Sequence, residues 1–242
     1  SAFWIKFNLE NISHRSKEWL ISFEQVNSSE YENKFITSKD KIPVFGMSNS
    51  VFWIKFDLEN ISHPSNEWLI SFQQVWCDYL DLYKKINGKW EVIKTGDRRI
   101  FDTREVNNRN FVFKVRPGKK STYYMRVQSN DGIQIPLKLY SASSFSEEES
   151  FTMLGFGLFY GIMLVMILYN LFVFLSTRSV SYLYYVFYIA SYTLINMATN
   201  GLGFQFLYPE WVWFQNEGFL CRASLIVLAL ILFTRKYLGV DD

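Results

Sequence analysis

Hydrophobic and polar residues alternate in short runs between residues 50 and 140. In the run at 52–59, Phe, Ile, Phe and Leu occupy the even positions and Trp, Lys, Asp and Glu the odd ones. A period of two is typical of a strand with one buried face, and Asn87-Gly88 is typical of a tight turn between two strands. The pattern predicts an antiparallel β-sandwich of about eight short strands. After residue 60 the runs lie at 68–72, 75–86, 90–96, 111–115, 122–129 and 133–140. Between the runs at 111–115 and 122–129, Pro117-Gly118 is expected to form a charged hairpin turn.

A different pattern follows. Residues 151–175 contain no charged side chain, and a helix of this length, rising about 1.5 Å per residue, is long enough to cross a bilayer. Because hydrocarbon offers no water to pair with backbone groups, such a run must be helical. Two further apolar stretches follow at 182–200 and 218–234. We therefore expect a β-sandwich domain at 42–145 and three transmembrane helices within 146–242, so that the 49% hydrophobic content averages two unlike halves.

The second apolar stretch is less hydrophobic than the first, since it contains serine, threonine and asparagine. On hydropathy alone it fits an interfacial helix as well as a span. Arg178 precedes this stretch, Arg235 and Lys236 end the third one, and the loop at 201–217 between them carries only acidic charges. Because Lys and Arg are enriched on the cytoplasmic side, this distribution favours two spans with the N-terminal domain outside.

Several positions in the helical part carry a structural signal. Ser146 and Glu149 form a capping-box pattern, which predicts that the first helix begins at Ser146. Gly157 and Gly161 form a GxxxG motif, which marks a close helix contact or reflects the ordinary frequency of glycine in membrane helices; a second copy of the chain is one candidate partner. Asn170 is the most polar side chain of the first span and is expected to face other helices.

Arg222 places a charge near the outer end of the third apolar stretch. One interpretation is that its long side chain snorkels to the outer interface. The other is a buried role, with a ligand or a helix carboxylate as its partner. The sequence leaves both open.

An internal duplication occupies the N-terminal third. Residues 1–26 recur at 50–75 with 21 of 26 positions identical. No third unit is present, so the chain is not a repeat array, and we interpret the copy as a local duplication or a joining error. The copy at 50–75 continues into further strands, whereas the first copy is followed by polar residues. We therefore expect residues 1–41 to be peripheral or poorly ordered, and the chain, which opens on Ser1, to be a fragment without its export signal.

Composition narrows the chemistry. A net charge of +2 gives no signal for nucleic-acid binding, and two cysteines cannot provide a disulfide framework. The two histidines, His14 and His63, occupy the same turn position in the two copies, and neither has a second ligand at metal-site spacing. We expect no metal, no cofactor and no catalytic residue, and hence a protein that is not an enzyme.

Ligand binding is the remaining activity to place. Within a strand, the residues that face away from the core are free to meet a ligand. In the strand at 122–129, these are the polar and aromatic side chains that alternate with Tyr123, Met125 and Val127. The candidate ligand-binding residues are Trp76, Tyr79, Tyr83, Arg98, Arg109, Tyr124, Arg126, Gln128 and Gln134.

The order of these segments carries a resemblance. The runs SNSVFWIKFDLEN, DYLDLY, VIKTGD, RNFVFKV, TYYMRVQS and IPLKLY, followed by GLFYGIMLVMILYNLFVFLSTRSVSYLYYVFY and NGLGFQFLYP, resemble the bacterial seven-transmembrane receptors with diverse intracellular signalling modules. The resemblance covers about residues 42–238. It implies a periplasmic jelly-roll domain that binds carbohydrate or a similar small ligand, seven helices in the inner membrane, and a cytoplasmic signalling domain as output.

Two departures accompany the resemblance. The chain carries the extra copy at 1–26, and it stops after the third apolar stretch. The sequence therefore predicts a receptor fragment with the first three helices of a truncated seven-helix bundle. The alternative is a membrane-anchored envelope enzyme or a transport accessory protein.

Overall fold

The computed structural model describes residues 27, 35, 42–47, 50–59, 67–86, 88–118 and 120–239. The first copy of the duplication, and both histidines, lie outside these residues. Contacts within the chain divide it into two compact units, residues 1–145 and 146–242. Each unit is described by itself.

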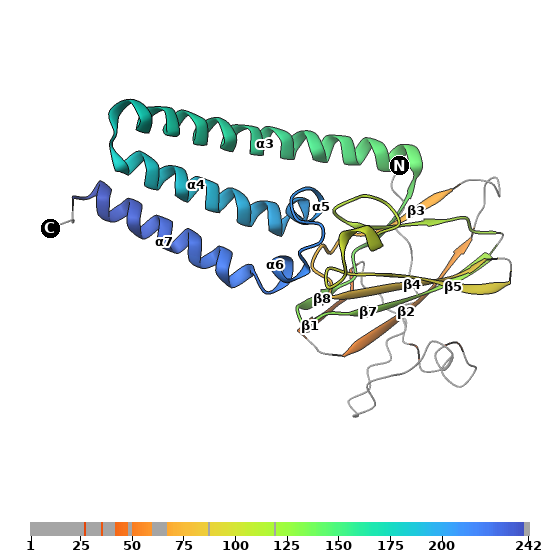
Figure 1. Ribbon diagram of the computed structural model, residues 1–242. Helices are drawn as coiled ribbons and strands as arrows, with labels where there is room; N and C mark the ends of the chain where they lie inside the picture. The colour runs from red at the N-terminus through yellow and green to blue at the C-terminus, as the bar shows by residue number, and fades with distance from the viewer. Residues whose placement is uncertain are drawn as a thin grey trace. The chain divides into compact units, whose positions relative to one another are not determined.

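Three antiparallel sheets make up the described part of the first unit (Figure 1). A short ribbon pairs β1 (Val44–Met47) with β8 (Gly132–Gln134). The four-stranded sheet has the order β2 (Val51–Glu59), β7 (Lys120–Gln128), β4 (Tyr79–Ile86) and β5 (Lys89–Thr95). The three-stranded sheet has the order β6 (Phe111–Val115), β3 (Trp68–Phe72) and β9 (Leu137–Ser141), and a single turn of 3₁₀-helix, η1 (Phe101–Thr103), lies between β5 and β6.

One hydrophobic core fills the space between the two larger sheets. Ile54 of β2 and Met125 of β7 contribute to it from one side, and Ile70 of β3 and Phe113 of β6 from the other, each at most 1% exposed. Burying side chains of this size stabilises the fold by about 1.5–3 kcal/mol each. The alternation at 52–58 is confirmed as a strand with its even positions in the core, and the sandwich architecture is confirmed with it.

The predicted turns have mixed outcomes. The hairpin between β4 and β5 is confirmed, because Ile86 pairs with Lys89 and Gly88 has a φ of +82°. Pro117-Gly118 was expected to form a charged hairpin turn, which is wrong: β6 pairs with β3, whereas β7 pairs with β2 and β4. The chain crosses from one sheet to the other at that point.

The run at 133–140 is not a single strand. It separates into β8, which pairs with β1, and β9, which pairs with β3. Pro136 lies between them and has no N–H to continue a ladder, although its carbonyl accepts a hydrogen bond from the Gln73 N–H (3.1 Å). Because of this interruption, residues 133–140 contribute one strand to the ribbon with β1 and another to the three-stranded sheet.

The outer face of the three-stranded sheet is covered. Leu69, Val112 and Tyr140 form a second buried cluster there, and Val106 and Phe145 pack against it. The rings of Tyr140 and Phe145 lie 5.6 Å apart at 71°. Phe145 is in the first turn of α3 (Ala142–Thr177), so the residues of this helix that belong to the first unit contribute to its packing.

Helix α3 begins four residues before the predicted start at Ser146. The Ser141 hydroxyl accepts a hydrogen bond from the Ser144 N–H (3.2 Å) and so provides the N-terminal cap. Ser146 lies inside the helix, where its carbonyl accepts a hydrogen bond from the Ser150 hydroxyl (2.7 Å). The capping-box prediction was therefore wrong, and β9 passes into α3 without a linker.

The second unit contains the rest of α3, α4 (Val180–Thr199), α5 (Leu202–Phe206), α6 (Val212–Asn216) and α7 (Phe219–Tyr237). Helices α4 and α7 lie side by side (Figure 1), with the rings of Tyr185 and Phe233 5.3 Å apart. Among the described helices, α3 alone is both long and apolar enough to cross a membrane. The spans expected at 182–200 and 218–234 remain predictions.

The two glycines of the GxxxG motif and Asn170, all in α3, differ in their surroundings. A side chain added at Gly157 or Gly161 would meet nothing within 4 Å, so neither glycine lies at a contact with the described helices. Asn170 is buried, and its side-chain amide donates to the Met166 carbonyl one turn earlier (2.8 Å).

Arg222 is 1% exposed in this unit. Its guanidinium lies 4.9 Å from the Phe214 ring and donates to the carbonyls of Phe214 and Gln215, the latter at 3.0 Å. Carbonyls at the end of a helix lack intrahelical partners, so Arg222 satisfies the last turn of α6. The sequence had suggested the outer interface, a ligand or a helix carboxylate as the partner of Arg222. In this unit its side chain binds backbone carbonyls instead.

Candidate functional site

Five of the nine predicted ligand-binding residues gather on the outer face of the four-stranded sheet. Tyr124, Arg126 and Gln128 of β7 alternate with core residues and therefore face outward. The strand register places them directly opposite Tyr83, Asp81 and Tyr79 of β4. The outward positions of these two strands thus form one continuous surface, which we call the open face.

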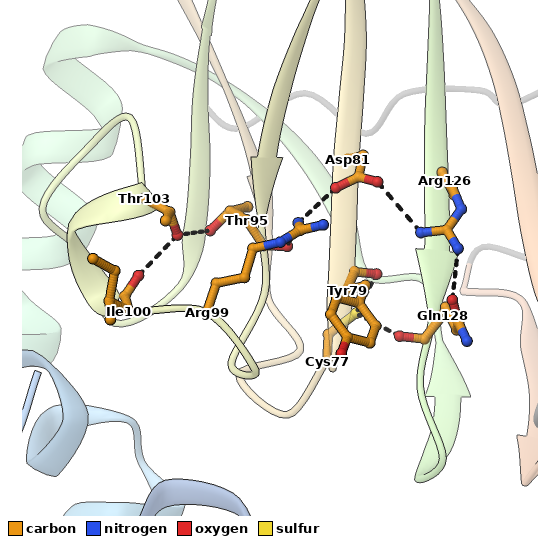
Figure 2. Close-up of polar contacts among 9 residues, drawn as sticks. All are labelled: Cys77, Tyr79, Asp81, Thr95, Arg99, Ile100, Thr103, Arg126 and Gln128. Atoms are coloured by element: carbon orange, nitrogen blue, oxygen red, sulfur yellow. Dashed lines mark hydrogen bonds and ion pairs between the residues drawn. The ribbon is translucent and has the colours of Figure 1, made fainter. Parts of the chain in front are cut away.

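A buried carboxylate organises the part of the open face shown in Figure 2. Asp81 accepts a hydrogen bond from Arg99 Nη1 at Oδ1 (2.6 Å) and one from Arg126 Nη1 at Oδ2 (3.3 Å). Arg126 also donates to the Gln128 side chain (2.6 Å), and the Arg99 guanidinium lies 5.2 Å from the Tyr79 ring. Since these groups bind one another, the cluster positions the face and leaves few of its donors for a ligand.

The remaining four predicted residues lie elsewhere. Trp76 is half-buried in the loop before β4, and Arg98 forms an ion pair with Asp78 (3.4 Å). The Arg109 carbonyl accepts a hydrogen bond from Arg104, and Gln134 is exposed on β8. The structure does not bring these four residues together with the open face.

A cavity of about 600 Å³ opens at the other end of the open face, next to the β4–β5 hairpin. This volume is in the range of small-molecule sites. Its lining combines aromatic rings, lysines and hydroxyl groups from β2, β4, β5 and β7. The described residues that line it are Asn27, Phe35, Lys55, Lys85, Gly88, Trp90, Lys120, Ser121, Thr122, Tyr123 and Tyr124.

The cavity has an aromatic corner with cations beside it. The rings of Trp90 and Tyr124 lie 5.6 Å apart at 69° to each other. The Lys85 ammonium is 5.9 Å from the Trp90 ring, and the Lys55 ammonium is 5.9 Å from the Tyr124 ring. The corner therefore brings aromatic rings and ammonium groups together at the edge of the cavity.

Asp57 neutralises the charge of Lys120, a third lysine that lines the cavity. Its carboxylate lies 3.2 Å from the Lys120 ammonium and accepts a hydrogen bond from the Thr122 hydroxyl (2.6 Å). Burial acts to raise the pKa of Asp57, but the hydrogen bonds from Thr122 and Lys120 outweigh it and hold the pKa below its usual range. Asp57 is therefore ionised at neutral pH, and the pair with Lys120 is neutral.

Sequence reasoning identified Tyr124 but missed Lys55, Lys85, Lys120 and Trp90. The hairpin signal at Asn87-Gly88 could have found two of them, because a two-residue turn places Lys85 opposite Trp90, as the register has it. The other two required the pairing of β2 with β7, which joins residues about 65 positions apart. No local pattern specifies that register.

Two charged side chains in the loop between β5 and β6, Asp97 and Arg104, are buried. The Arg104 guanidinium lies 4.4 Å from the Phe101 ring and 4.2 Å from the Phe111 ring, and it donates to the Asn108 carbonyl (2.8 Å). Burial lowers the pKa of Arg104 to about 9. Burial, and next the Asp78 carboxylate, raise the pKa of Asp97 to about 7. This loop connects the two larger sheets.

A reactive cysteine and a metal centre are two other kinds of functional site. Cys77 is fully buried, and burial, with the neighbouring Asp97, raises the pKa of its thiol well above the usual value. The thiol is therefore protonated and a poor nucleophile. In the described part of the chain, no three His, Cys, Asp or Glu side chains lie close enough to hold a metal ion.

The described chain combines a β-sandwich that has a cavity on one face with a following helix that is long and apolar enough to cross a membrane. The family comparisons agree: the family model 7TMR-DISM extracellular 2 matches residues 21–141, and 7TM diverse intracellular signalling matches residues 152–242. The chain therefore belongs to the seven-transmembrane receptors with diverse intracellular signalling, whose N-terminal domain is extracellular. No curated protein matches it.

Proposed function

We propose that this chain is the sensory and first transmembrane part of a signalling receptor whose sandwich binds a small ligand in the cavity beside Trp90 and Tyr124. The receptor lies in the inner membrane, with the sandwich on the periplasmic side and a cytoplasmic signalling domain as its output. Helices α4 and α7 are further spans of the same bundle. Carbohydrate is one candidate ligand, since sugar rings stack on aromatic side chains.

The cavity is the observation that carries this proposal. Its volume of about 600 Å³ suits a small molecule, and Trp90 and Tyr124 offer it two walls at 69°. The Asp81 cluster lies on the same sheet, and its arginines are paired with protein groups. A ligand in the cavity therefore meets an aromatic surface that this cluster and the sheet hold in place.

The output of binding would leave through the other sheet. Strand β9 ends at Ser141, α3 begins at Ala142, and Phe145 packs on Tyr140. A ligand that binds one arrangement of the sandwich more tightly shifts the population toward that arrangement. Because no flexible linker separates β9 from α3, such a shift would change the start of the transmembrane helix.

A binding screen tests the proposal. The 242-residue chain in lipid nanodiscs is titrated with sugars, peptidoglycan fragments and organic acids, and binding is measured by calorimetry. We expect at least one compound to bind, and Trp90→Ala to weaken it by about tenfold or more, since a lost stacking contact is worth about 1.5 kcal/mol. Trp76→Ala, a half-buried tryptophan outside the cavity, is the matched control and should leave affinity unchanged. Equal losses from both variants would contradict the cavity as the site.

A further inference from the structure

Residues 50–75 supply one strand to each of the two larger sheets. Strand β2 pairs with β7 at one edge of the four-stranded sheet, and β3 lies between β6 and β9 in the three-stranded sheet. Ile54 and Phe56 of β2, and Ile70 and Phe72 of β3, are at most 1% exposed in the shared core. The described sandwich therefore has one pair of strand positions for this segment, and its core fits the side chains of the segment.

The first copy of the duplication carries the same side chains. Residues 3–9 read FWIKFNL against FWIKFDL at 52–58, and both copies read WLISF, at 19–23 and 68–72. Every buried position of β2 and β3 has the identical residue in the first copy. Because the hydrophobic pattern decides which side of a strand enters a core, and burial of apolar side chains is the dominant favourable contribution to folding, the first copy fits these two strand positions as well as the second.

The differences between the copies lie outside the core of the described sandwich. Three of the five differences fall on described residues, Val51, Asp57 and Gln73, and none of the three is buried. Asp57 forms an ion pair with Lys120 (3.2 Å), whereas the first copy has Asn8 at this position. An ion pair between exposed side chains contributes little to stability. The core contacts therefore do not distinguish the copies, and this polar contact favours the second copy slightly.

We propose that residues 1–26 are an alternative occupant of the β2 and β3 positions in the same chain, so that the sandwich folds with either copy. This inference is independent of the proposed ligand. When the first copy is used, residues 27–75 form a loop that leaves the sandwich and returns at Trp76, and the entropy cost of such a loop rises only slowly with its length. Because β3 is a central strand, the choice is made while the sandwich folds. The second copy is favoured, since it continues directly into β4.

Matched core substitutions in the two copies test the proposal. Ile54→Asp puts an unpaired charge into the core through the second copy, which is strongly destabilising; Ile5→Asp is the equivalent change in the first copy. Each variant, and the double variant, is unfolded with urea as the full chain in micelles and followed by near-ultraviolet circular dichroism. Ile54→Asp should keep a cooperative transition, with its midpoint lower by about 1 M, and Ile5→Asp should change nothing. The double variant should lose the transition. An Ile54→Asp variant as unfolded as the double variant would overturn the proposal.

A disulfide reports which copy is in place. Glu59 and Lys120 are exposed and lie opposite each other on β2 and β7, and directly opposite residues are close enough for a disulfide. With Cys221→Ser removing the exposed thiol, Glu59→Cys with Lys120→Cys is the control and should crosslink within the unsubstituted chain.

The matching pair for the first copy is Glu10→Cys with Lys120→Cys. Its crosslink within one chain, measured on non-reducing gels and by peptide mass spectrometry, should rise severalfold when Ile54→Asp is added. Absence of this rise, or crosslinks that form only between two chains, would contradict an exchange of copies within one sandwich.

Discussion

The two larger sheets of the sandwich share one core, yet their outer faces differ. On the three-stranded sheet, Tyr140 is 1% exposed beneath Phe145 of α3. On the four-stranded sheet, the corresponding outward positions carry Lys55, Tyr124 and Arg126, and a cavity opens beside them. Val106 and Phe145 close the first outer face. On the second, Tyr124 is 5% exposed and packs with Trp53 and Phe35, but a cavity remains beside this cluster.

The difference shows how one sandwich can serve two purposes. A covered face gains stability from burial, and its packing includes Phe145 in the first turn of α3, where tightly packed side chains do not deform continuously. The open face keeps a cavity beside its buried rings, and its internal ion pairs hold its charged groups in position. We infer that recognition and transmission are assigned to opposite faces of one domain, with the shared core between them.

Gly96 gives the largest expected effect, because it begins the loop that connects the two sheets. Its φ is +140°, and a methyl group there would lie 2.1 Å from the Asp78 carbonyl oxygen. Gly96→Ala should therefore destabilise the sandwich by about 4 kcal/mol through strain and overlap. Urea unfolding of the chain in micelles, followed by near-ultraviolet circular dichroism, measures this. Gly132→Ala, where a methyl group meets nothing, is the control and should cost less than about 1 kcal/mol.

Tyr140 tests the covered face. Tyr140→Ala removes a buried ring from the Leu69, Val112 and Phe145 packing and should cost about 3–4 kcal/mol in the same unfolding measurement. Tyr140→Phe keeps the ring and loses the hydrogen bond from Gln73 (3.2 Å), so it should cost about 1 kcal/mol. Similar small losses in both variants would mean that the covered face contributes little to stability.

Asp97 gives the sandwich a pH dependence. Its pKa is about 7 in the folded protein against an ordinary value of 3.8, so between pH 4 and 7 the folded state binds more protons than the unfolded state. Stability should therefore fall as the pH rises through this window, by on the order of 3 kcal/mol. Asp97→Asn removes the titrating group and should flatten the profile. An unchanged profile in that variant would assign the dependence to another group.

Trp90 should have the smallest effect on stability. It is half-buried on the edge strand β5, and Trp90→Ala should cost less than about 1 kcal/mol of folding free energy while weakening ligand binding. A loss as large as that of Tyr140→Ala would remove the contrast between the two faces, because both would then be structural.

Local patterns predicted the parts of the fold that local interactions decide. The alternation at 52–58 and the turn at Asn87-Gly88 gave β2 and the β4–β5 hairpin. The helix start was wrong because two serines, Ser141 and Ser146, could each provide a cap, and the pattern favoured the one that the structure does not use. The exchange between sheets at Pro117-Gly118 depends on long-range pairing and has no local signal.

The candidate site likewise has a part that local patterns predicted and a part that depends on tertiary contacts. Alternation placed Tyr124, Arg126 and Gln128 correctly on the outer side of their strand. It could not show that Asp81 pairs with Arg99 and Arg126, because the arginines come from different segments. Nor could it show that three lysines from three strands border one cavity. Which polar residues are already paired, and which are available, is decided by tertiary contacts.

The central claim is that binding on the open face reaches α3 through the covered face. The most direct test inserts Gly-Ser-Gly-Ser after Ser143 in the full-length receptor and measures ligand affinity and signalling output together. The flexible insertion should abolish output and leave affinity unchanged, whereas four alanines at the same position, which continue the helix for about one turn, should retain part of the output. Unchanged signalling with the Gly-Ser insertion would contradict transmission through α3.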